Sequence, residues 1–427
     1  MSLKVRRVKK TPLQVLKNYI SDFFERLSGL DKLTLVLVCF LFGIGLLMIY
    51  SITSISIYNG VKNDPTNFFI KTLIMAVAGI GAMGVIIIMP YRMLKNLSFL
   101  AVIGCPLILL VTLLFAKGSA DSDVNSWFQI GSFKLQPAEF VKIGMILAIA
   151  WLVSRGIDKK MYYLNSLKDI NLNLFFQSFV FVICYFGLCT GLVLLQPDFG
   201  SALILGFIGL IMFLATGVKY KAYRPLVYVG IMILITGIFV MIKAFPYQAE
   251  RFTMWLDDPF THDKGFQNVM GYTAIALGGL SGVGVGNSTQ KYGYVLEPHN
   301  DMISTIIAEE LGVWMILVIM IAYFVIGIRC FLTAAKCQDM FAALVSVGVG
   351  TIFFVQPIIN LGGASGALPL TGVTLPFISY GGSSLVSLFL GVGIYLNVRM
   401  EMIAQQKKMR EQKKQLLKTK VVPFPKS

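Results

Sequence analysis

The chain has 427 residues, of which 56% are hydrophobic and only 14% charged, and its mean hydropathy is +0.76. These values exclude an ordinary soluble domain, in which about a quarter of the residues are charged, and they indicate a polytopic helical membrane protein. The net charge of +16 does not indicate nucleic-acid binding, because the basic residues concentrate in the segments expected on the inner rim of the membrane, where anionic lipid attracts them.

The chain begins with a basic segment, residues 1–32, that we expect in the cytoplasm. Apolar residues recur in it at helical spacing between Leu13 and Leu27, which predicts a helix on the inner membrane surface or against a partner. We expect no cleavable signal, because a polar and basic segment precedes the first apolar window, which then acts as a retained signal-anchor.

A membrane-spanning helix needs about 20 mainly apolar residues, and ten windows meet this requirement. They are residues 33–55, 68–89, 97–116, 138–155, 174–195, 200–217, 223–244, 302–328, 340–362 and 377–398. We therefore predict an all-α, ten-helix membrane domain over residues 33–398, followed by a basic cytoplasmic tail, 399–427, that is solvated or loosely helical.

Ten spans place both termini on one side of the membrane. The segments on that side hold 28 of the 37 Lys and Arg residues, so that side is cytoplasmic by the positive-inside rule. The longest polar interruption, residues 244–301, is then an extracellular loop before the eighth helix. The six cysteines show no metal or redox spacing and are expected as free thiols.

The extracellular loop ends in Glu297-Pro298-His299-Asn300-Asp301, directly before an apolar window. An ionisable group at a membrane boundary costs free energy and usually marks function, although Asp301 or Asn300 can also cap the following helix. Glu309 and Glu310 lie two turns further on. They either fix helix packing through hydrogen bonds or line a polar cavity leading from Asp301, an arrangement that suits an enzyme and a transporter equally.

Two other outer segments carry charge next to predicted helices. Glu139 lies in the first turn after Pro137, where it stabilises a helix N-terminus, and Lys142 three residues on can pair with it. The pair can equally line a polar cavity. Asp198 lies in a tight turn between two windows and can cap the second of them.

The long loop also contains Arg251 and Lys291 around a glycine-rich run, residues 278–286. No strand precedes this run and no Gly-Lys-Ser/Thr ending follows it, so we predict no nucleotide site. Close helix packing or a flexible hinge explains the glycines more simply.

The most specific pattern of the chain lies near its C-terminal end. It consists of Asn360-Leu361-Gly362, Gly366, Pro369, Thr371-Gly372 and the run Leu375-Pro376-Phe377-Ile378-Ser379-Tyr380-Gly381-Gly382-Ser383-Ser384. This pattern resembles the SEDS family (shape, elongation, division and sporulation) of ten-helix membrane glycosyltransferases, and the resemblance runs from the first window to about Asn397. Matching residues elsewhere include Trp127, Glu139, Gln196-Pro197-Asp198-Phe199-Gly200, Arg251 and Glu309-Glu310-Leu311-Gly312.

Residues Val295 to Met302 are similar to a family motif whose final acid, regarded as catalytic, falls on Asp301. The chain keeps Glu297, His299 and Asp301 of this motif. It departs from the family at Leu296, Pro298, Asn300 and Met302, and at Ser126 before the Trp.

The resemblance implies polymerisation of peptidoglycan glycan strands from lipid II on the outer face of the cytoplasmic membrane. Asp301 would then be the general base for the attacking hydroxyl. A basic side chain, or a divalent cation such as Mg²⁺ or Mn²⁺, would neutralise the departing pyrophosphate. The expected substrate-binding residues are Arg251, Lys291, His299, Glu139, Lys142 and Asp198.

The family also implies partners, namely a class B penicillin-binding protein transpeptidase and other division proteins, while the basic inner rim predicts contact with anionic membrane lipid. The form of residues 360–366 resembles FtsW of a Gram-positive bacterium more than RodA, which implies a place at the division septum. The alternatives are a lipid II flippase, a polymerase of the elongation type, and a scaffold that only recruits a transpeptidase.

Overall fold

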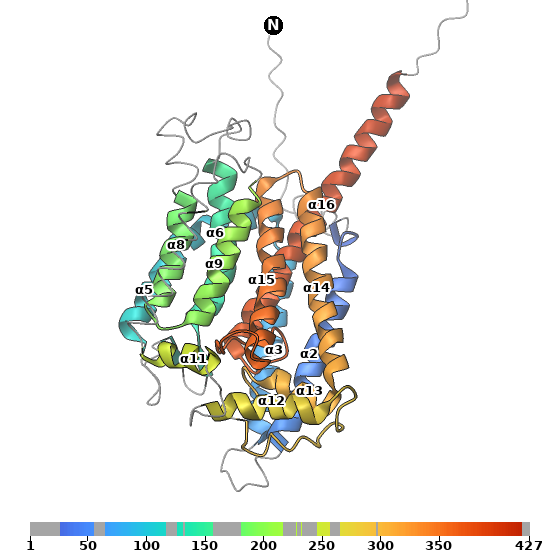
Figure 1. Cartoon of the computed structure of the whole chain (residues 1–427). Coiled ribbons are helices and arrows are strands. Elements are labelled where there is room, and N and C mark those ends of the chain that lie inside the picture. Colours follow the sequence, from blue (N-terminus) through green and yellow to red (C-terminus); the bar gives the residue numbers. More distant parts are fainter. Residues whose placement is uncertain are drawn as a thin grey trace, which may run out of the picture.

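The computed structural model describes residues 26–54, 65–116, 126–130, 133–156, 181–216, 228, 232, 246–256, 265–295 and 298–420. These residues form a bundle of helices with one short hairpin (Figure 1). The helix predicted between Leu13 and Leu27 lies outside the described residues except at its end, and so does the window 223–244 apart from two residues.

The helices fall into two halves along the chain. The first half contains α2 (Lys32–Thr53), α3 (Pro65–Ile88), α4 (Tyr91–Leu97), α5 (Phe99–Phe115), α6 (Pro137–Gly156), α8 (Phe181–Leu194) and α9 (Phe199–Leu214). The second contains α11 (Pro246–Leu256), α12 (Phe266–Gly278), α13 (Ile303–Leu311), α14 (Val313–Lys336), α15 (Met340–Ala364) and α16 (Gly382–Lys420).

Six described helices, α2, α3, α6, α14, α15 and α16, are long and apolar enough to cross a membrane, and α4 with α5 makes a seventh span bent by 44°. Two further apolar helices, α8 and α9, are shorter. The prediction of a multi-span, all-α membrane protein is therefore confirmed. The number of ten spans and their topology stay predictions.

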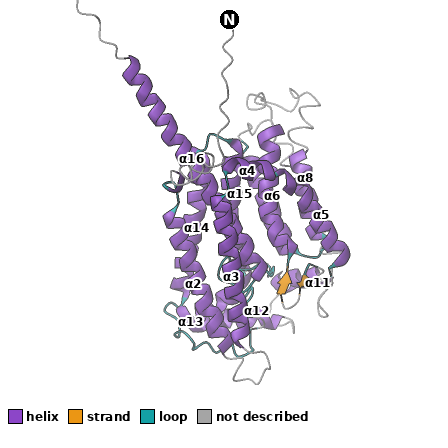
Figure 2. Cartoon of the chain, turned by 180° about the vertical axis from the view of Figure 1, so that it is seen from behind, coloured by secondary structure: helices purple, strands orange, loops and turns teal. Residues whose placement is uncertain are grey.

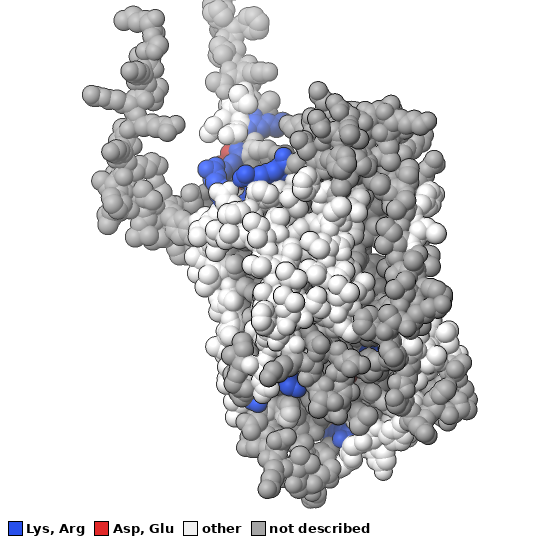
Figure 3. Space-filling model, turned by 90° about the vertical axis from the view of Figure 1, so that its left-hand side faces the viewer, with Lys and Arg blue, Asp and Glu red and all other residues white. Residues whose placement is uncertain are grey.

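The two ends of the bundle differ in charge. The Arg26 Nε atom lies 3.3 Å from Glu401 Oε2, so the residue range before α2 and the far part of α16 share one end. Lys and Arg gather at this end (Figure 3), whereas α11, α12 and α13 lie at the opposite end (Figure 1). We call these ends cytoplasmic and outer, following the predicted topology.

The hairpin of β1 (Phe128–Ile130) and β2 (Phe133–Leu135) is antiparallel, with Phe128 opposite Leu135. Figure 2 shows it at the outer end, close to α11. The backbone N–H of Gln136 donates to Ser383 Oγ over 3.1 Å, and Ser383 Oγ donates to the Lys134 carbonyl over 3.3 Å. These bonds join the start of α6 to the start of α16.

The predicted single span 302–328 is wrong, because the helix breaks at Gly312 into α13 and α14. Gly312 has a φ of +86°, which favours glycine, and a Cβ atom there would lie 2.2 Å from the Leu280 carbonyl oxygen. Backbone N–H groups of Val283 and Gly284 donate to the carbonyls of Glu309 and Glu310 over 2.9 and 3.0 Å. The glycine run thus packs closely against this break, as one of the two interpretations predicted, and satisfies its carbonyls.

The predicted span 377–398 is wrong at its N-terminal end, and the helix runs on past residue 398 into the predicted tail. The helix α16 begins only at Gly382 and continues to Lys420. Before it lies a non-helical segment, residues 366–381, which we call the signature loop. Its Phe377 has a φ of +62° and is 3% exposed, and its ring packs against Phe389 with a centroid distance of 5.0 Å. The buried packing holds this strained residue and prevents α16 from starting earlier.

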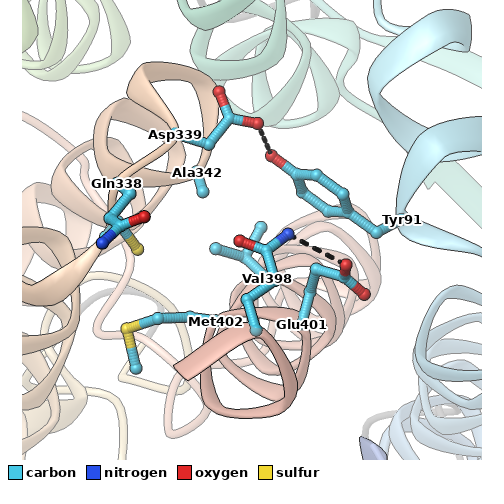
Figure 4. Close-up of a pocket in the computed structure, with 9 residues that line it drawn as sticks. Tyr91, Gln338, Asp339, Ala342, Val398, Glu401 and Met402 are labelled. Carbon is cyan, nitrogen blue, oxygen red and sulfur yellow. Dashed lines mark hydrogen bonds between the residues drawn. The ribbon is translucent and has the colours of Figure 1, made fainter. Parts of the chain in front are cut away.

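Two carboxylates organise the cytoplasmic end. Asp31 caps α2 and accepts hydrogen bonds from Arg329 (2.6 Å) and Tyr395 Oη (2.9 Å). Asp339 caps α15 and accepts from Lys95 Nζ (2.8 Å) and Tyr91 Oη (2.5 Å), the second of which is drawn in Figure 4. The space beside Asp339 is only about 10 Å³, room for about one water, so it is no substrate site.

We predict that Asp339 stabilises the protein in a pH-dependent way. Burial by itself raises the pKa of Asp339, but hydrogen bonds from Lys95 and Tyr91 hold it below its ordinary value. The stabilisation is therefore present above the unfolded pKa of about 3.9 and is lost as the pH falls through the folded value. A Lys95→Met variant should melt below the wild type at neutral pH, and the difference in Tm should narrow in acid.

The measurement is Tm in detergent at a series of pH values. Lys32→Met is the matched control, since Lys32 is exposed at the same end of the bundle. A Tm difference that stays constant across the series would contradict the prediction.

Candidate functional site

Asp301 lies in a turn at the outer end, directly before α13. The N-cap of α13 is Met302, with no side-chain capping bond, so Asp301 lies one residue before the cap. Its carbonyl oxygen accepts a hydrogen bond from Asn360 Nδ2 over 2.8 Å. Two residues earlier, the His299 carbonyl accepts from the backbone N–H of Tyr380 over 2.8 Å. The end of the outer loop is thereby bound to α15 and to the signature loop.

Arg251 reaches the same place from α11. Its Nη1 atom donates to the Leu370 carbonyl in the signature loop over 2.9 Å. A Cβ atom built at Gly372 would lie 3.7 Å from Arg251 Nη1 and 3.9 Å from Asp301 Oδ2. Gly372 has a φ of +72°, so a side chain there would strain the backbone. The guanidinium and the carboxylate therefore converge on one glycine of the signature loop.

His299 lies in an aromatic cluster at the edge of this site. Its ring centroid is 5.0 Å from that of Phe68 on α3 and 5.6 Å from that of Tyr380, and the last two are 5.1 Å apart. Ring contacts of this kind stabilise by about 0.5–1.5 kcal/mol each beyond their buried area. The cluster holds the outer loop against α3 and places His299 two residues from Asp301.

Glu139 and Lys142 form the predicted local ion pair, with Nζ and Oε2 2.8 Å apart. Both side chains are buried, and Lys142 Nζ also donates to Gln356 Oε1 over 3.2 Å. Gln356 Nε2 in turn donates to the Thr374 carbonyl over 2.9 Å. A buried polar network therefore links α6 through α15 to the signature loop.

Asp198 has the capping role considered for it. Its Oδ1 atom accepts from the backbone N–H of Ser201 at the start of α9 over 3.0 Å, and its Oδ2 atom accepts from Gln136 Nε2 over 2.7 Å. Burial raises the pKa of Asp198 above its ordinary value, and the nearby charge of Glu139 adds to this effect. The geometry gives Asp198 a structural role beside the hairpin.

Lys291, which was expected to bind substrate, lies in a buried ion pair. Its Nζ atom lies 2.6 Å from Glu310 Oε1, and the two side chains are 1% and 0% exposed. Ser51 Oγ on α2 donates to the same carboxylate over 2.8 Å. Glu309 accepts from Ser288 Oγ over 2.5 Å and from the backbone N–H of Thr289 over 2.8 Å. Both glutamates therefore fix helix packing, as one of the two alternatives predicted.

The described residues contain no group of three or more His, Cys, Asp and Glu side chains that could hold a metal ion. A single carboxylate such as Asp301 fits a Mg²⁺ ion only when substrate phosphate and water supply the other oxygen ligands, which is a common arrangement for this ion. The residues present are therefore compatible with a cation that arrives with a phosphorylated substrate.

An apolar groove of about 410 Å³ lies among α12, α13, α14 and α15. Ser304, one turn beyond Asp301, lines it together with residues such as Ile316, Met320 and Leu361. Because the lining offers contacts to hydrocarbon rather than acids or bases, the groove is not where a reaction takes place.

Sequence reasoning assigned no role to Gln356 and Asn360, although the second belongs to the quoted pattern. Both are buried amides on the otherwise apolar α15, and they are four residues apart. Residues at this spacing share one helix face, and a buried amide in a membrane helix needs hydrogen-bond partners. The spacing of the two amides can be read from the sequence, but their hydrogen-bond partners cannot.

Comparison with known proteins identifies the family. The model of the Cell cycle protein family of FtsW, RodA and SpoVE matches residues 32–403. The chain belongs to this family. It is 36% identical to the probable peptidoglycan glycosyltransferase FtsW of Bacillus subtilis (strain 168) over 418 residues, which cover 92% of this chain and 98% of that protein. It is 31% identical to stage V sporulation protein E of the same organism, over 86% and 96% of the two chains.

Solved structures confirm the fold. The chain superposes with a TM-score of 0.68 and 24% identity on a chain of a peptidoglycan synthase complex that coordinates polymerization and crosslinking, covering 87% of this chain and 98% of that one. The Thermus thermophilus rod shape determining protein RodA gives a TM-score of 0.62 at 21% identity, with 87% and 97% covered. The family and the names of these relatives make the chain a multi-pass membrane glycosyltransferase of the SEDS family.

We predict that Lys291 serves stability rather than substrate binding. A Lys291→Met variant leaves the Glu310 carboxylate buried without its cation, and losing one partner of such a pair destabilises a protein by about 3–5 kcal/mol. Replacing both charges, in Lys291→Met/Glu310→Leu, should restore most of the stability. Thermal unfolding in detergent measures both effects.

A double variant that melts as early as the single one would show that the ion pair is not the cause. A double variant that is stable but inactive would show instead that Lys291 acts on substrate.

Proposed function

We propose that this glycosyltransferase polymerises peptidoglycan glycan strands from lipid II at the outer face of the cytoplasmic membrane, with Asp301 as the general base. The observation that carries the proposal is the convergence of the Asp301 carboxylate and the Arg251 guanidinium on Gly372. The position of this pair at the outer end, beside a segment anchored to the bundle, suits a lipid-linked substrate whose sugar extends out of the bilayer.

The chemistry requires one base and one charge-stabilising group. The 4-hydroxyl of a GlcNAc residue attacks the anomeric carbon of MurNAc in a second lipid-linked unit, and undecaprenyl pyrophosphate leaves. Asp301 accepts the hydroxyl proton, while Arg251 donates to the pyrophosphate oxygens as their charge develops. One displacement inverts the anomeric centre, so an α-linked donor gives a β-linked strand. A Mg²⁺ or Mn²⁺ ion held near Asp301 would add to this neutralisation.

The proposal extends to partners and place. A class B penicillin-binding protein would cross-link the strands, as suggested by the match to a complex that coordinates polymerization with crosslinking. Other division proteins and the septum follow from the likeness to FtsW of Bacillus subtilis. The basic cytoplasmic end (Figure 3) suits contact with anionic lipid.

Asp301→Asn should abolish polymerisation, because an amide cannot take up the proton. General-base catalysis raises reaction rates by about 10²- to 10⁴-fold, so the rate of polymerisation is expected to fall by at least about 10²-fold. Asp301→Glu, which keeps the carboxylate at a different distance, should retain part of the activity. The assay is the formation of glycan polymer from purified lipid II by the protein together with its transpeptidase.

Asp339→Asn is the matched control, since it changes the same group at the cytoplasmic end. An Asp301→Asn protein that folds and polymerises at the normal rate would contradict the assignment of Asp301 as the general base. Transport of lipid II across liposomes without polymer would favour a flippase.

Arg251→Ala should lower kcat/KM by about tenfold or more, because a hydrogen bond to a charged group stabilises by about 1.5–3 kcal/mol and each 1.4 kcal/mol is tenfold. Arg251→Lys should lose less, since it keeps the charge but not the paired donors of the guanidinium. Arg155→Ala is the control, because Arg155 lies outside the site. On α6, its Cζ atom is 4.9 Å from the centroid of the Trp151 ring. Equal kcat/KM values for Arg251→Ala and wild type would contradict the prediction.

A further inference from the structure

Asn360 on α15 binds two pieces of backbone that are far apart in the sequence. Its Nδ2 group donates to the carbonyl of Asp301 over 2.8 Å and to the carbonyl of Val373 over 2.7 Å. Asp301 belongs to the outer loop, and Val373 is the neighbour of Gly372 in the signature loop. One primary amide therefore uses both of its N–H groups to join the two segments that form the site.

The orientation of this amide is fixed by its partners. If the Asn360 amide were flipped, Oδ1 would face the two carbonyl oxygens, neither of which can donate a hydrogen bond. As it stands, Oδ1 is buried and has no hydrogen-bond partner among the described residues. Leaving a buried acceptor unsatisfied costs free energy, so this orientation is held by the two bonds that Nδ2 donates.

The same helix face supports the signature loop a second time. Gln356, one turn earlier on α15, donates from Nε2 to the carbonyl of Thr374. Two amides one turn apart thus hold the consecutive residues Val373 and Thr374. Gly372, on which Arg251 and Asp301 converge, directly precedes these two residues.

We propose that Asn360 is a positioning residue for Asp301. It sets the distance between the outer loop and the signature loop, so that the Asp301 carboxylate faces Gly372 and Arg251. Asn360 touches the backbone of Asp301 and not its carboxylate, so it acts through Asp301 and takes no part in the chemistry. This inference rests on the proposed function, in which Asp301 is the base.

The chain contains a matched control for this arrangement. Asn397 on α16 is also a buried amide, and its Nδ2 group donates to the carbonyls of Ile86 and Met89 over 2.7 Å each. It lies at the cytoplasmic end, where its Oδ1 accepts from Arg26. The two asparagines make the same kind of bond, but only Asn360 binds the loop that carries Asp301.

The experiment compares alanine and aspartate variants at both positions, with activity expressed per amount of folded protein determined by thermal unfolding. Asn360→Ala should lower kcat by about 10²-fold, the scale expected for a displaced reacting group, with a smaller change in KM. Asn397→Ala should lower the amount of folded protein but leave kcat per folded molecule within about twofold of the wild type.

The pH profile separates positioning from packing. The wild-type rate should fall in acid as Asp301 becomes protonated. In Asn360→Asp, a carboxylate would repel both carbonyls at neutral pH, whereas the protonated acid formed at lower pH can donate to one of them. The ratio of wild-type to Asn360→Asp activity should therefore fall toward one as the pH falls. The ratio of wild-type to Asn397→Asp activity should stay the same.

Asp301→Asn is assayed in parallel to keep the two hypotheses apart. An active Asp301→Asn protein overturns the proposed function. The inference about Asn360 alone is overturned if Asp301→Asn is inactive and the Asn360 variants lose activity only in proportion to folded protein. It is also overturned if Asp301→Asn is inactive and the ratio of wild-type to Asn360→Asp activity does not change with pH.

Discussion

The constraint on which the site depends is that non-helical backbone at membrane depth must find its hydrogen bonds inside the protein. The signature loop, residues 366–381, interrupts a chain of apolar helices and exposes carbonyls that a helix would have satisfied. Side chains from the surrounding helices meet this need. Asn360 and Gln356 bind Val373 and Thr374, and Tyr323 Oη donates to the carbonyl of Pro376 over 2.5 Å.

The same constraint explains how residues distant in the sequence come together. Because the loop folds back into the bundle, its backbone bonds to the outer loop at His299 and to Arg251 of α11. The outer loop is bound a second time at Asp301, by Asn360 of α15. The backbone, rather than a cluster of reactive side chains, is the common support. A glycine at position 372 then leaves room for the carboxylate and the guanidinium to approach one point.

Charges within the bundle follow a second rule, that a buried ion needs a partner. Glu310 is paired with Lys291, and Glu139 with Lys142. The first pair joins α13 to α2 through Ser51, and the second joins α6 to α15 through Gln356. These pairs hold in place the helices around the site. At the cytoplasmic end, Asp31 and Asp339 hold helices together where the basic residues gather.

Hydropathy and charge are properties of local segments, so the amino-acid sequence was enough to predict the class of fold and the position of most apolar helices. The role of Asp301 stays a prediction. The sequence also predicted the Glu139–Lys142 pair, which depends only on helical spacing. It failed where distant segments decide the outcome. The break at Gly312 requires the glycine run to pack against it, and the late start of α16 requires the buried Phe377. Lys291 was expected near a pyrophosphate but lies in a buried pair with Glu310, and Asn360 had no assigned role until its two carbonyl partners were seen. Only the tertiary structure decides such contacts, since they depend on which backbone segments the folded bundle brings within hydrogen-bond distance.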